Sequence, residues 1–284
     1  MPLITRSTPL IEDLNLSSGR YRVFTYNEFV RFHSNKKTFR YAPRSLLLYH
    51  QKKGHIVRIR RRLYCIVPIG IKPKECPMNP FLVANKLTED SVLSYRTALD
   101  YFGKLHTSVN EFLYLAKKKD NNPFHYKNVT YRSVSIPTAL QRAKKIDFEV
   151  MQLHQEGHVV KITSLERTFV DILDRPNLCG SLEEIWRSFE NIEYLNLDKV
   201  IEYALLLGNA TTIAKVGFCL EDHLEQWMVS ENHLKELRKY IPLQPHYMQH
   251  RRQEPQKLVS RWNLLVPISV LEKAWEEPRD TCKV

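Results

Sequence analysis

The sequence predicts an α+β protein with a small, strongly basic N-terminal part and a larger, helix-rich C-terminal part. The 284 residues are enough for two domains, and 43% of them are hydrophobic, which is typical of a chain that buries a core. Within the first 70 residues the apolar pattern changes from helical to two-residue periodicity, and helical patterns dominate after residue 163. The charge is also distributed unevenly between the two parts.

Almost all of the net charge of +12 comes from one N-terminal segment. Residues 20–80 contain 15 basic and 2 acidic residues, a net charge of +13, whereas the rest of the chain contains 28 basic and 29 acidic residues, a net charge of −1. Such a segment attracts a polyanion. Because apolar residues recur through it, we expect a folded basic unit and not a disordered tail.

Two helices are predicted in this basic segment. Thr25 and Glu28 have the spacing of a capping box, which opens a helix that continues to about His33. Pro43 suits the first turn of a second helix, and Gly54 suits the position just past its end. At about 100° per residue, one face of the second helix is apolar. The opposite face carries Arg44, Ser45, Leu48 and Lys52.

A β-hairpin is predicted directly after the second helix. Val57 and Ile59 alternate with Arg58 and Arg60, and Leu63–Val67 forms an apolar second strand. Helix, turn, helix and hairpin in this order are typical of a winged helix-turn-helix, which reads the major groove with its second helix and contacts phosphates or the minor groove with its wing. The predicted DNA-binding residues are Arg40, Arg44, Ser45, Leu48, Lys52, Arg58, Arg60, Arg61 and Arg62.

The simpler interpretation of these charges is a solvated basic face, since most runs of charge lie in solvent. We favour DNA binding, because the charges lie on the two elements that would touch a duplex while apolar residues of both elements point inward. RNA is a less favoured partner, because the segment offers no aromatic platform for stacking single-stranded bases.

The C-terminal part begins after a proline-rich linker, so the predicted domains are residues 1–80 and residues 81–284. The larger domain is expected to be mixed α/β and rich in helices. Its predicted elements are a helix from Asp90 to Gly103, strands over Glu111–Ala116, Val129–Ile136 and Val159–Ile162, helices opened by capping boxes at Thr163–Glu166 and Ser181–Glu184, a helix pair over Asp198–Leu207 and Ala210–His223, and a final strand over Leu258–Pro267.

The sequence has no recognisable catalytic or metal-binding motif. It contains no P-loop, nucleophile elbow or dinucleotide-binding glycines, and none of its five cysteines forms a C-x-x-C pair. We therefore expect no enzyme activity, no cofactor and no metal. Asp171 and Asp174 could be carboxylates of a nuclease, but neighbouring arginines favour ion pairs. No apolar run approaches the ~20 residues of a membrane helix and no signal peptide is recognisable, so we expect a cytoplasmic protein with no membrane partner.

Several segments resemble the AbiEi family of bacterial antitoxins. The hairpin RIRRRLYCIVP (Arg58–Pro68) is similar to the family's wing, although Arg62 stands where the family usually has a glycine that eases a turn with positive φ. The run SLERTFVD (Ser164–Asp171) is similar to a helix of the family, and the longer run from Glu166 to Pro176 is fairly specific. Shorter similarities cover Leu173–Pro176, Glu184–Ser188, Ser94–Leu99 and Arg261–Pro267, so the resemblance spans both predicted domains.

The resemblance implies a type IV toxin–antitoxin system, with a role in phage defence. It implies that the N-terminal domain binds inverted repeats in double-stranded promoter DNA as a repressor, as a monomer or weak dimer that can bind cooperatively. It also implies that the C-terminal domain counteracts an AbiEii-like nucleotidyltransferase toxin without a stable complex. The candidate antitoxicity residues are Glu166, Arg167, Asp171, Asp174 and Arg175, and the last four are expected to form one charged stripe at the surface of a helix.

Two alternative functions remain open at this point. The first is a plain winged-helix transcription factor whose second domain binds a ligand or oligomerises, and a neighbouring nucleotidyltransferase gene would argue against it. The second is a DNA-targeted nuclease, which metal-dependent cleavage of plasmid DNA would support.

Overall fold

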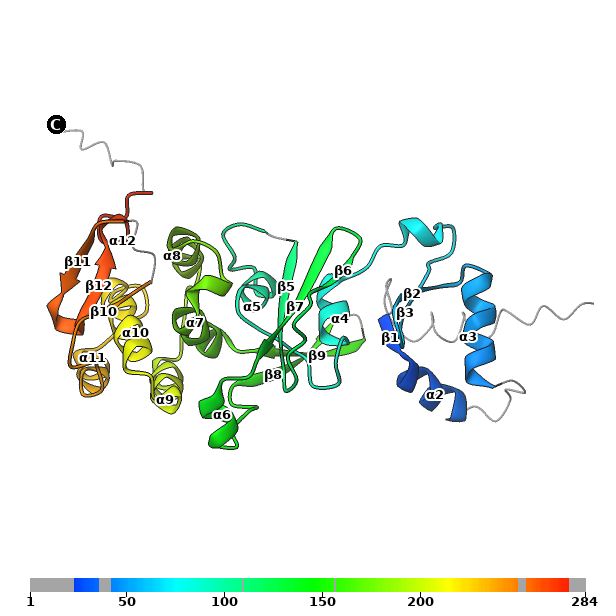
Figure 1. Ribbon diagram of the computed structural model, residues 1–284, viewed down its shortest axis with the longest axis horizontal. Helices are drawn as coiled ribbons and strands as arrows, with labels where there is room; N and C mark the ends of the chain where they lie inside the picture. The colour runs from blue at the N-terminus through cyan, green and yellow to red at the C-terminus, as the bar shows by residue number, and fades with distance from the viewer. Residues whose placement is uncertain (1–22, 36–41, 109, 156, 250–253, 276–284) are drawn as a thin grey trace, which may run out of the picture. The chain divides into compact units, whose positions relative to one another are not determined.

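The structure is a computed structural model that describes residues 23–35, 42–108, 110–155, 157–249 and 254–275. Its described residues combine helices with three separate sheets, which confirms the predicted α+β class (Figure 1). The chain divides into two compact units. Unit 1 comprises Met1–Leu93, Asn110–Ser135 and Met151–Ile162, and unit 2 comprises Ser94–Val109, Ile136–Val150 and Thr163–Val284. The expected division into domains after residue 80 stays a prediction.

Within unit 1, the basic segment forms a strand, two helices and a hairpin. These are β1 (Val23–Thr25), α2 (Tyr26–Asn35), α3 (Pro43–Lys52), β2 (Ile56–Arg60) and β3 (Leu63–Ile66). The three strands form one antiparallel sheet in the order β1-β3-β2. The helices and the hairpin lie where the sequence predicts them, whereas β1 was not predicted because three residues are too short to show a period. The winged-helix assignment itself stays a prediction.

The ends of the two helices follow the expected local chemistry. The Glu28 carboxylate accepts a hydrogen bond from the Thr25 backbone N–H at 2.7 Å, and the Glu28 N–H donates to the Thr25 hydroxyl oxygen at 3.2 Å, which confirms the capping box. Gly54, just past α3, has a φ of +75°, a conformation that glycine adopts without steric cost.

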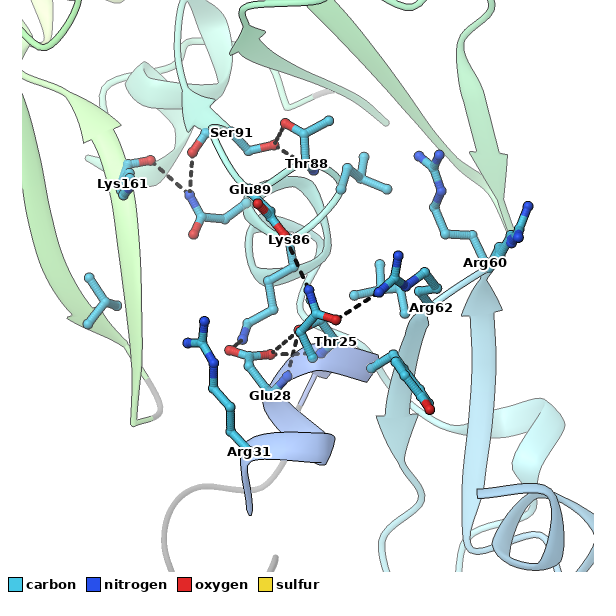
Figure 2. A pocket seen from close by; sticks show the side chains of 17 residues that line it. Thr25, Glu28, Arg31, Arg60, Arg62, Lys86, Thr88, Glu89, Ser91 and Lys161 are labelled. Atoms are coloured by element: carbon cyan, nitrogen blue, oxygen red, sulfur yellow. Dashed lines mark hydrogen bonds and ion pairs between the residues drawn. The ribbon is translucent and has the colours of Figure 1, made fainter. Parts of the chain in front are cut away.

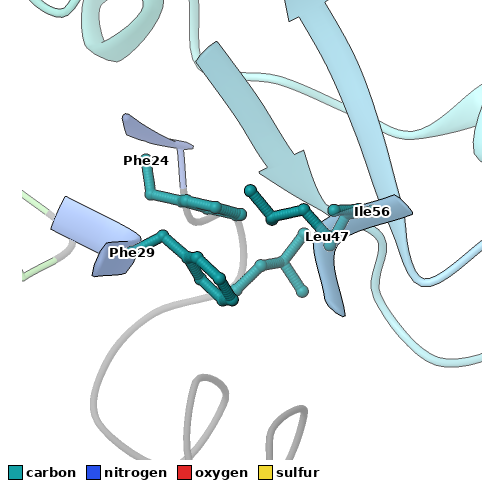
Figure 3. Packing of buried hydrophobic residues seen from close by; sticks show 5 residues of the cluster. Phe24, Phe29, Leu47 and Ile56 are labelled. Carbon is teal, nitrogen blue, oxygen red and sulfur yellow. The ribbon is translucent and has the colours of Figure 1, made fainter. Parts of the chain in front are cut away.

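The core of this segment joins both helices to the sheet (Figure 3). It consists of the buried residues Phe24, Phe29, Leu47, Ile56 and Ile66. Leu47 comes from the inner face of α3, so burying it fixes which face of α3 turns outward.

The remainder of unit 1 contains helix α4 (Pro80–Asn85) and a six-stranded sheet in the order β6-β7-β5-β4-β9-β8. Phe81 of α4 packs edge-on against Phe112 of the sheet, with ring centroids 5.1 Å apart. Neighbours β5 and β7 are parallel, as are β4 and β9. The strands are β4 (Val92–Leu93), β5 (Glu111–Ala116), β6 (Phe124–Tyr126), β7 (Val129–Ser135), β8 (Val150–Gln155) and β9 (His158–Thr163).

One element of this region was predicted wrongly. The expected helix from Asp90 to Gly103 is replaced by strand β4 and the shorter helix α5 (Arg96–Tyr101). Asp90 does not cap a helix, because its carboxylate accepts a hydrogen bond from the backbone N–H of Lys117 at 2.6 Å. The side chain therefore holds the end of β5 next to β4.

Unit 2 is mainly helical. Helix α7 (Leu165–Asp174) packs against α5, α9 and α10, and so is covered on several sides (Figure 1). The last residues form a three-stranded sheet in the order β10-β12-β11. The other elements are α6 (Thr138–Arg142), α8 (Leu182–Glu190), α9 (Leu197–Leu207), α10 (Ala210–Asp222), α11 (Glu231–Arg238), β10 (His246–Tyr247), β11 (Gln256–Val259), β12 (Leu264–Pro267) and α12 (Ile268–Leu271), with short 3-10 turns at Pro73–Glu75 in unit 1 and at Pro176–Leu178 and Ser260–Trp262 in unit 2.

Two predictions in unit 2 need correction. The capping residue of α7 is Ser164, whose hydroxyl accepts from the Arg167 N–H at 3.2 Å, and not Thr163, whose hydroxyl instead contacts that of Thr168 at 2.7 Å. The expected strand over Leu258–Pro267 is a hairpin of β11 and β12 whose connection contains the buried Trp262. The Ser181 capping box is present as predicted.

Among the residues that the structure describes, no helix has both the length and the apolar character needed to cross a membrane.

Candidate nucleic-acid interface

The outer face of α3 presents the side chains that the sequence assigns to DNA reading. Arg44, Ser45 and Lys52 are exposed, and the Leu48 side chain is 51% exposed. Together they offer a guanidinium, a hydroxyl, an ammonium and an apolar group on one face, which are the groups that recognise base edges and phosphates. Arg40, the remaining predicted residue before α3, lies outside the described residues.

A contact between the buried His50 and the partly buried His55 helps to fix the inner face of α3. The Nδ1 atoms of His50 and His55 lie 3.1 Å apart, so one ring nitrogen donates and the other accepts. Burial, together with the nearby charge of His55, lowers the pKa of His50 to about 4. The His50 imidazole is therefore neutral near pH 7. Its contact with His55 attaches the end of α3 to the start of β2.

The wing places its arginines in different environments. Arg58 and Arg61 are exposed, whereas Arg60 is half-buried and its guanidinium lies 5.4 Å from the ring centroid of Phe124. The hairpin register shifts between Arg58 and Arg60, which is a bulge that redirects side chains near the tip. Arg58 and Arg61 are therefore the wing residues most accessible to a duplex.

Arg62 occupies the wing turn with a φ of +68°. A glycine would adopt this conformation with less steric cost, which agrees with the glycine that the AbiEi wing usually has there. The Arg62 guanidinium donates to the side-chain oxygen of Asn27 at 2.8 Å and lies 5.7 Å from the ring centroid of Tyr26. These contacts attach the wing turn to α2.

A cleft of about 530 Å³ opens beside the wing within unit 1 (Figure 2). Its lining adds two lysines that the sequence analysis did not select, Lys86 after α4 and Lys161 of β9. No spacing pattern could have identified them, because the fold brings them to the wing from positions 24 and 99 residues beyond Arg62. The described cleft residues carry six basic side chains, Arg31, Arg60, Arg61, Arg62, Lys86 and Lys161, and two acidic ones, Glu28 and Glu89.

Both acidic side chains of the cleft already have partners. Glu28 forms an ion pair with Lys86 in addition to its capping bonds, and Glu89 accepts from the side-chain amide of Asn27 at 3.3 Å. Burial acts to raise the pKa of Glu28, but the hydrogen bond and charge of Lys86 and the bonds from Thr25 lower it overall. Glu28 is therefore ionised at neutral pH, and it neutralises Lys86.

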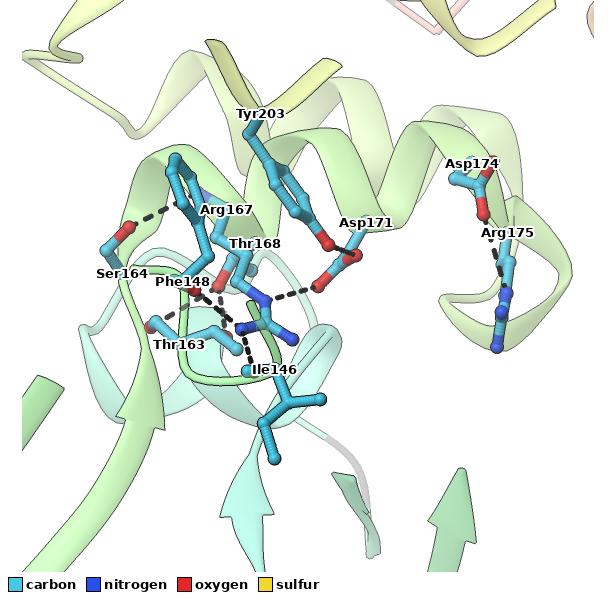
Figure 4. Close-up of polar contacts among 10 residues, drawn as sticks. All are labelled: Ile146, Phe148, Thr163, Ser164, Arg167, Thr168, Asp171, Asp174, Arg175 and Tyr203. Atoms are coloured by element: carbon cyan, nitrogen blue, oxygen red, sulfur yellow. Dashed lines mark hydrogen bonds and ion pairs between the residues drawn. The ribbon is translucent and has the colours of Figure 1, made fainter. Parts of the chain in front are cut away.

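Two of the five candidate antitoxicity residues, Arg167 and Asp171, are buried, and Figure 4 shows the contacts that they make. The side chains of Arg167 and Asp171 are 0% and 1% exposed, so the prediction that they belong to an exposed stripe is wrong. Arg167 Nε donates to Asp171 at 3.4 Å, and Arg167 Nη1 donates to the backbone carbonyls of Ile146 and Phe148 at 3.0 and 2.6 Å. The guanidinium thus joins α7 to the chain segment before β8.

Asp171 is held in turn by Tyr203 of α9, whose hydroxyl donates to the carboxylate at 2.6 Å. Burial raises the pKa of Asp171 above its ordinary value, and the Arg167 guanidinium opposes that effect. Since α5, α9 and α10 cover α7, this cluster connects helices and offers no surface to a partner.

The other three candidates lie nearer the surface. Asp174 and Arg175 form an ion pair at 3.4 Å with side chains 17% and 34% exposed. The Asp174 carboxylate also accepts from the Thr212 hydroxyl at 2.6 Å. Glu166 is half-buried, and its carboxylate accepts from the backbone N–H of Asn196 at 3.1 Å. Arg175 is the candidate that a partner can reach most easily.

Within the described ranges, no group of three or more histidine, cysteine, aspartate or glutamate side chains is placed to hold a metal ion.

No family model and no curated protein matches this chain. Among solved structures, the RV2827C protein from Mycobacterium tuberculosis is similar, with a TM-score of 0.59 and 12% sequence identity. The alignment covers 94% of this chain and 96% of that chain. At this identity the similarity concerns the fold alone, so the chain shares its α+β fold with that protein over nearly its whole length.

Proposed function

We propose that this protein is a sequence-specific DNA-binding regulator, in which a winged helix reads a duplex with α3 and with the β2–β3 wing. The observation that carries the proposal is the exposed face of α3, where Arg44, Ser45, Leu48 and Lys52 face outward over a core that fixes the helix. Arginine suits guanine edges, a hydroxyl suits either base, and an apolar side chain suits the thymine methyl. The net charge of +13 in residues 20–80 supports the attraction to phosphate.

We propose further, from the resemblance to AbiEi antitoxins, that the protein represses its own toxin–antitoxin operon. Its C-terminal part would counteract a nucleotidyltransferase toxin without a stable complex and without enzyme activity of its own. A role at a promoter also implies a cytoplasmic protein. Of the five candidate antitoxicity residues, Asp174 and Arg175 have the accessible charge that a partner would need, while Arg167 and Asp171 serve the fold.

The proposal is tested by measuring the affinity of the full chain for the duplex upstream of its own gene across a salt series. If the interface neutralises four or more phosphates, log K falls against log[salt] with a slope of roughly −4 or steeper. The upstream duplex should bind more tightly than a scrambled duplex of the same length and composition. A slope near zero, or equal affinity for both duplexes, contradicts the proposal.

A further inference from the structure

The cleft beside the wing has an excess of positive charge that its own acids do not neutralise. Glu28 neutralises Lys86, and Glu89 is held by an amide. Within the described part of the chain, Arg31, Arg61 and Lys161 have no carboxylate partner. The six basic and two acidic lining residues leave an excess of four positive charges in this cleft.

The lining also contains neutral hydrogen-bonding groups suited to an oxyanion. The hydroxyls of Thr88 and Ser91 line the cleft 2.8 Å apart, so one donates to the other and one hydroxyl proton is left for a ligand (Figure 2). The Thr25 hydroxyl also lines the cleft, but it donates to Glu28 at 3.1 Å. Guanidinium, ammonium and hydroxyl groups that converge on one cavity are the donors that bind phosphate oxygens. In Figure 2, Arg31 and Arg60 project from opposite sides of the cleft, so a bound anion would lie between α2 and the wing.

The size and charge of the cleft favour a small ligand with several phosphates. A volume of about 530 Å³ lies within the ~300–1,000 Å³ range of small-molecule sites. A single phosphate carries too little negative charge to balance the four excess positive charges of the cleft, whereas two or three linked phosphates can balance them.

We propose that this cleft binds a small polyphosphate, a compound with at least two linked phosphate groups, and that the bound ligand competes with DNA for the wing. The second half of the proposal depends on the proposed DNA-binding function. Arg60, Arg61 and Arg62 belong both to the predicted wing contact and to the cleft lining. Binding of ligand and of DNA is therefore mutually unfavourable, and each lowers the affinity for the other by the same factor.

Inorganic triphosphate is the probe, titrated into the full chain by calorimetry. Wild type should bind it saturably. Lys161→Gln should weaken this binding by about tenfold, the effect of one charge-assisted contact, whereas Lys161→Arg should retain it. Lys118→Gln, at an exposed lysine outside the cleft lining, is the matched control and should bind as wild type does.

A second titration measures how much triphosphate is needed to displace the upstream duplex from the protein. Sulfate at equal ionic strength is the control for electrostatic screening. Lys161→Gln should bind the duplex as wild type does and should need about tenfold more triphosphate to release it.

Three results overturn the proposal: no saturable binding of triphosphate, equal triphosphate affinity in Lys161→Gln and Lys118→Gln, or loss of duplex affinity in Lys161→Gln before any triphosphate is added. The last result would make the cleft a DNA contact. If Lys161→Gln fails to fold, unchanged triphosphate affinity in a folded Lys161→Ala overturns the proposal instead. If triphosphate binds in a manner that depends on Lys161 but no duplex binds, the ligand site stands and the DNA-binding function fails.

Discussion

Arg167 belongs to the run on which the proposed resemblance to antitoxins mainly rests, and its environment is that of a structural residue. Its guanidinium makes three hydrogen bonds, one to Asp171 and two to backbone carbonyls before β8. A buried guanidinium in such a position orders the groups around it. Removing it takes the donor from two buried carbonyls and the counter-charge from Asp171, which keeps only its hydrogen bond from Tyr203.

We therefore expect Arg167→Ala to lower the free energy of unfolding by about 3–5 kcal/mol, as is typical when one member of a buried ion pair is removed. Denaturant unfolding of the full chain measures this change. Arg175→Ala is the matched control, because the Arg175 side chain is 34% exposed and its pair with Asp174 should contribute less than about 1 kcal/mol. Equal midpoints for the two variants would show that the buried cluster does not support the fold.

The sequence predicted the identities of these residues but not their burial. Spacings of four and seven residues place Arg167, Asp171 and Asp174 on one face of a helix. Such spacing cannot reveal that α5, α9 and α10 together cover that face as well as the apolar one. A buried ion pair and a solvated one therefore have the same pattern in a sequence.

The wing is the element in which local sequence and structure agree most closely. The two-residue alternation predicted β2, and the turn falls at Arg61 and Arg62 as expected. Strands β1 and β4 were missed because two or three residues are too few to show a repeated alternation. The six-residue strand β8 was missed as well. Strand β5, with six residues, was predicted with its bounds as observed.

For this element we expect Arg58→Ala and Arg61→Ala each to weaken binding to all duplexes about equally. Each variant should make the slope of log K against log[salt] shallower by about one, since each removes one phosphate contact and no base contact. Lys119→Ala, at an exposed lysine after β5, should leave the slope unchanged. A loss restricted to one duplex sequence would instead mean that the wing reads bases.

At the scale of the whole molecule, we predict that DNA binding resides before Phe81 and that antitoxicity resides in the part of the chain from Phe81 onward. The core of the basic segment consists of residues between Phe24 and Ile66, and all six strands of the larger sheet come from residues after Ser91, so removing that segment removes no strand of this sheet. Residues 81–284 contain 27 basic and 27 acidic residues, so their net charge is zero.

We expect a chain of residues 81–284 to unfold cooperatively, to have no measurable affinity for DNA, and to rescue cells from the cognate toxin. Circular dichroism melting, duplex binding and growth under toxin expression measure these three properties. A truncated chain that folds but never rescues contradicts the assignment of antitoxicity to this part, and one that binds DNA contradicts the assignment of binding to α3 and the wing.

The long-range arrangement was the part of the fold least accessible to sequence reasoning. The cleft beside the wing combines side chains from α2, β2, the segment after α4, and β9. Nothing in the local pattern around Lys86 or Lys161 indicates that neighbourhood, because it depends on how β4 and β9 pair. The α+β class could be predicted from periodicity, whereas the lining of a cavity depends on the tertiary structure.

The central claim, that the outer face of α3 reads DNA sequence, is tested most directly by Arg44→Ala. Its affinity is compared with that of wild type for the upstream duplex and for a scrambled duplex. If Arg44 contacts a guanine edge, the variant loses about 1–3 kcal/mol of binding free energy on the upstream duplex and relaxes specificity at one base pair, with affinity for the scrambled duplex nearly unchanged. An Arg44→Ala protein that binds the upstream duplex as tightly as wild type contradicts the claim.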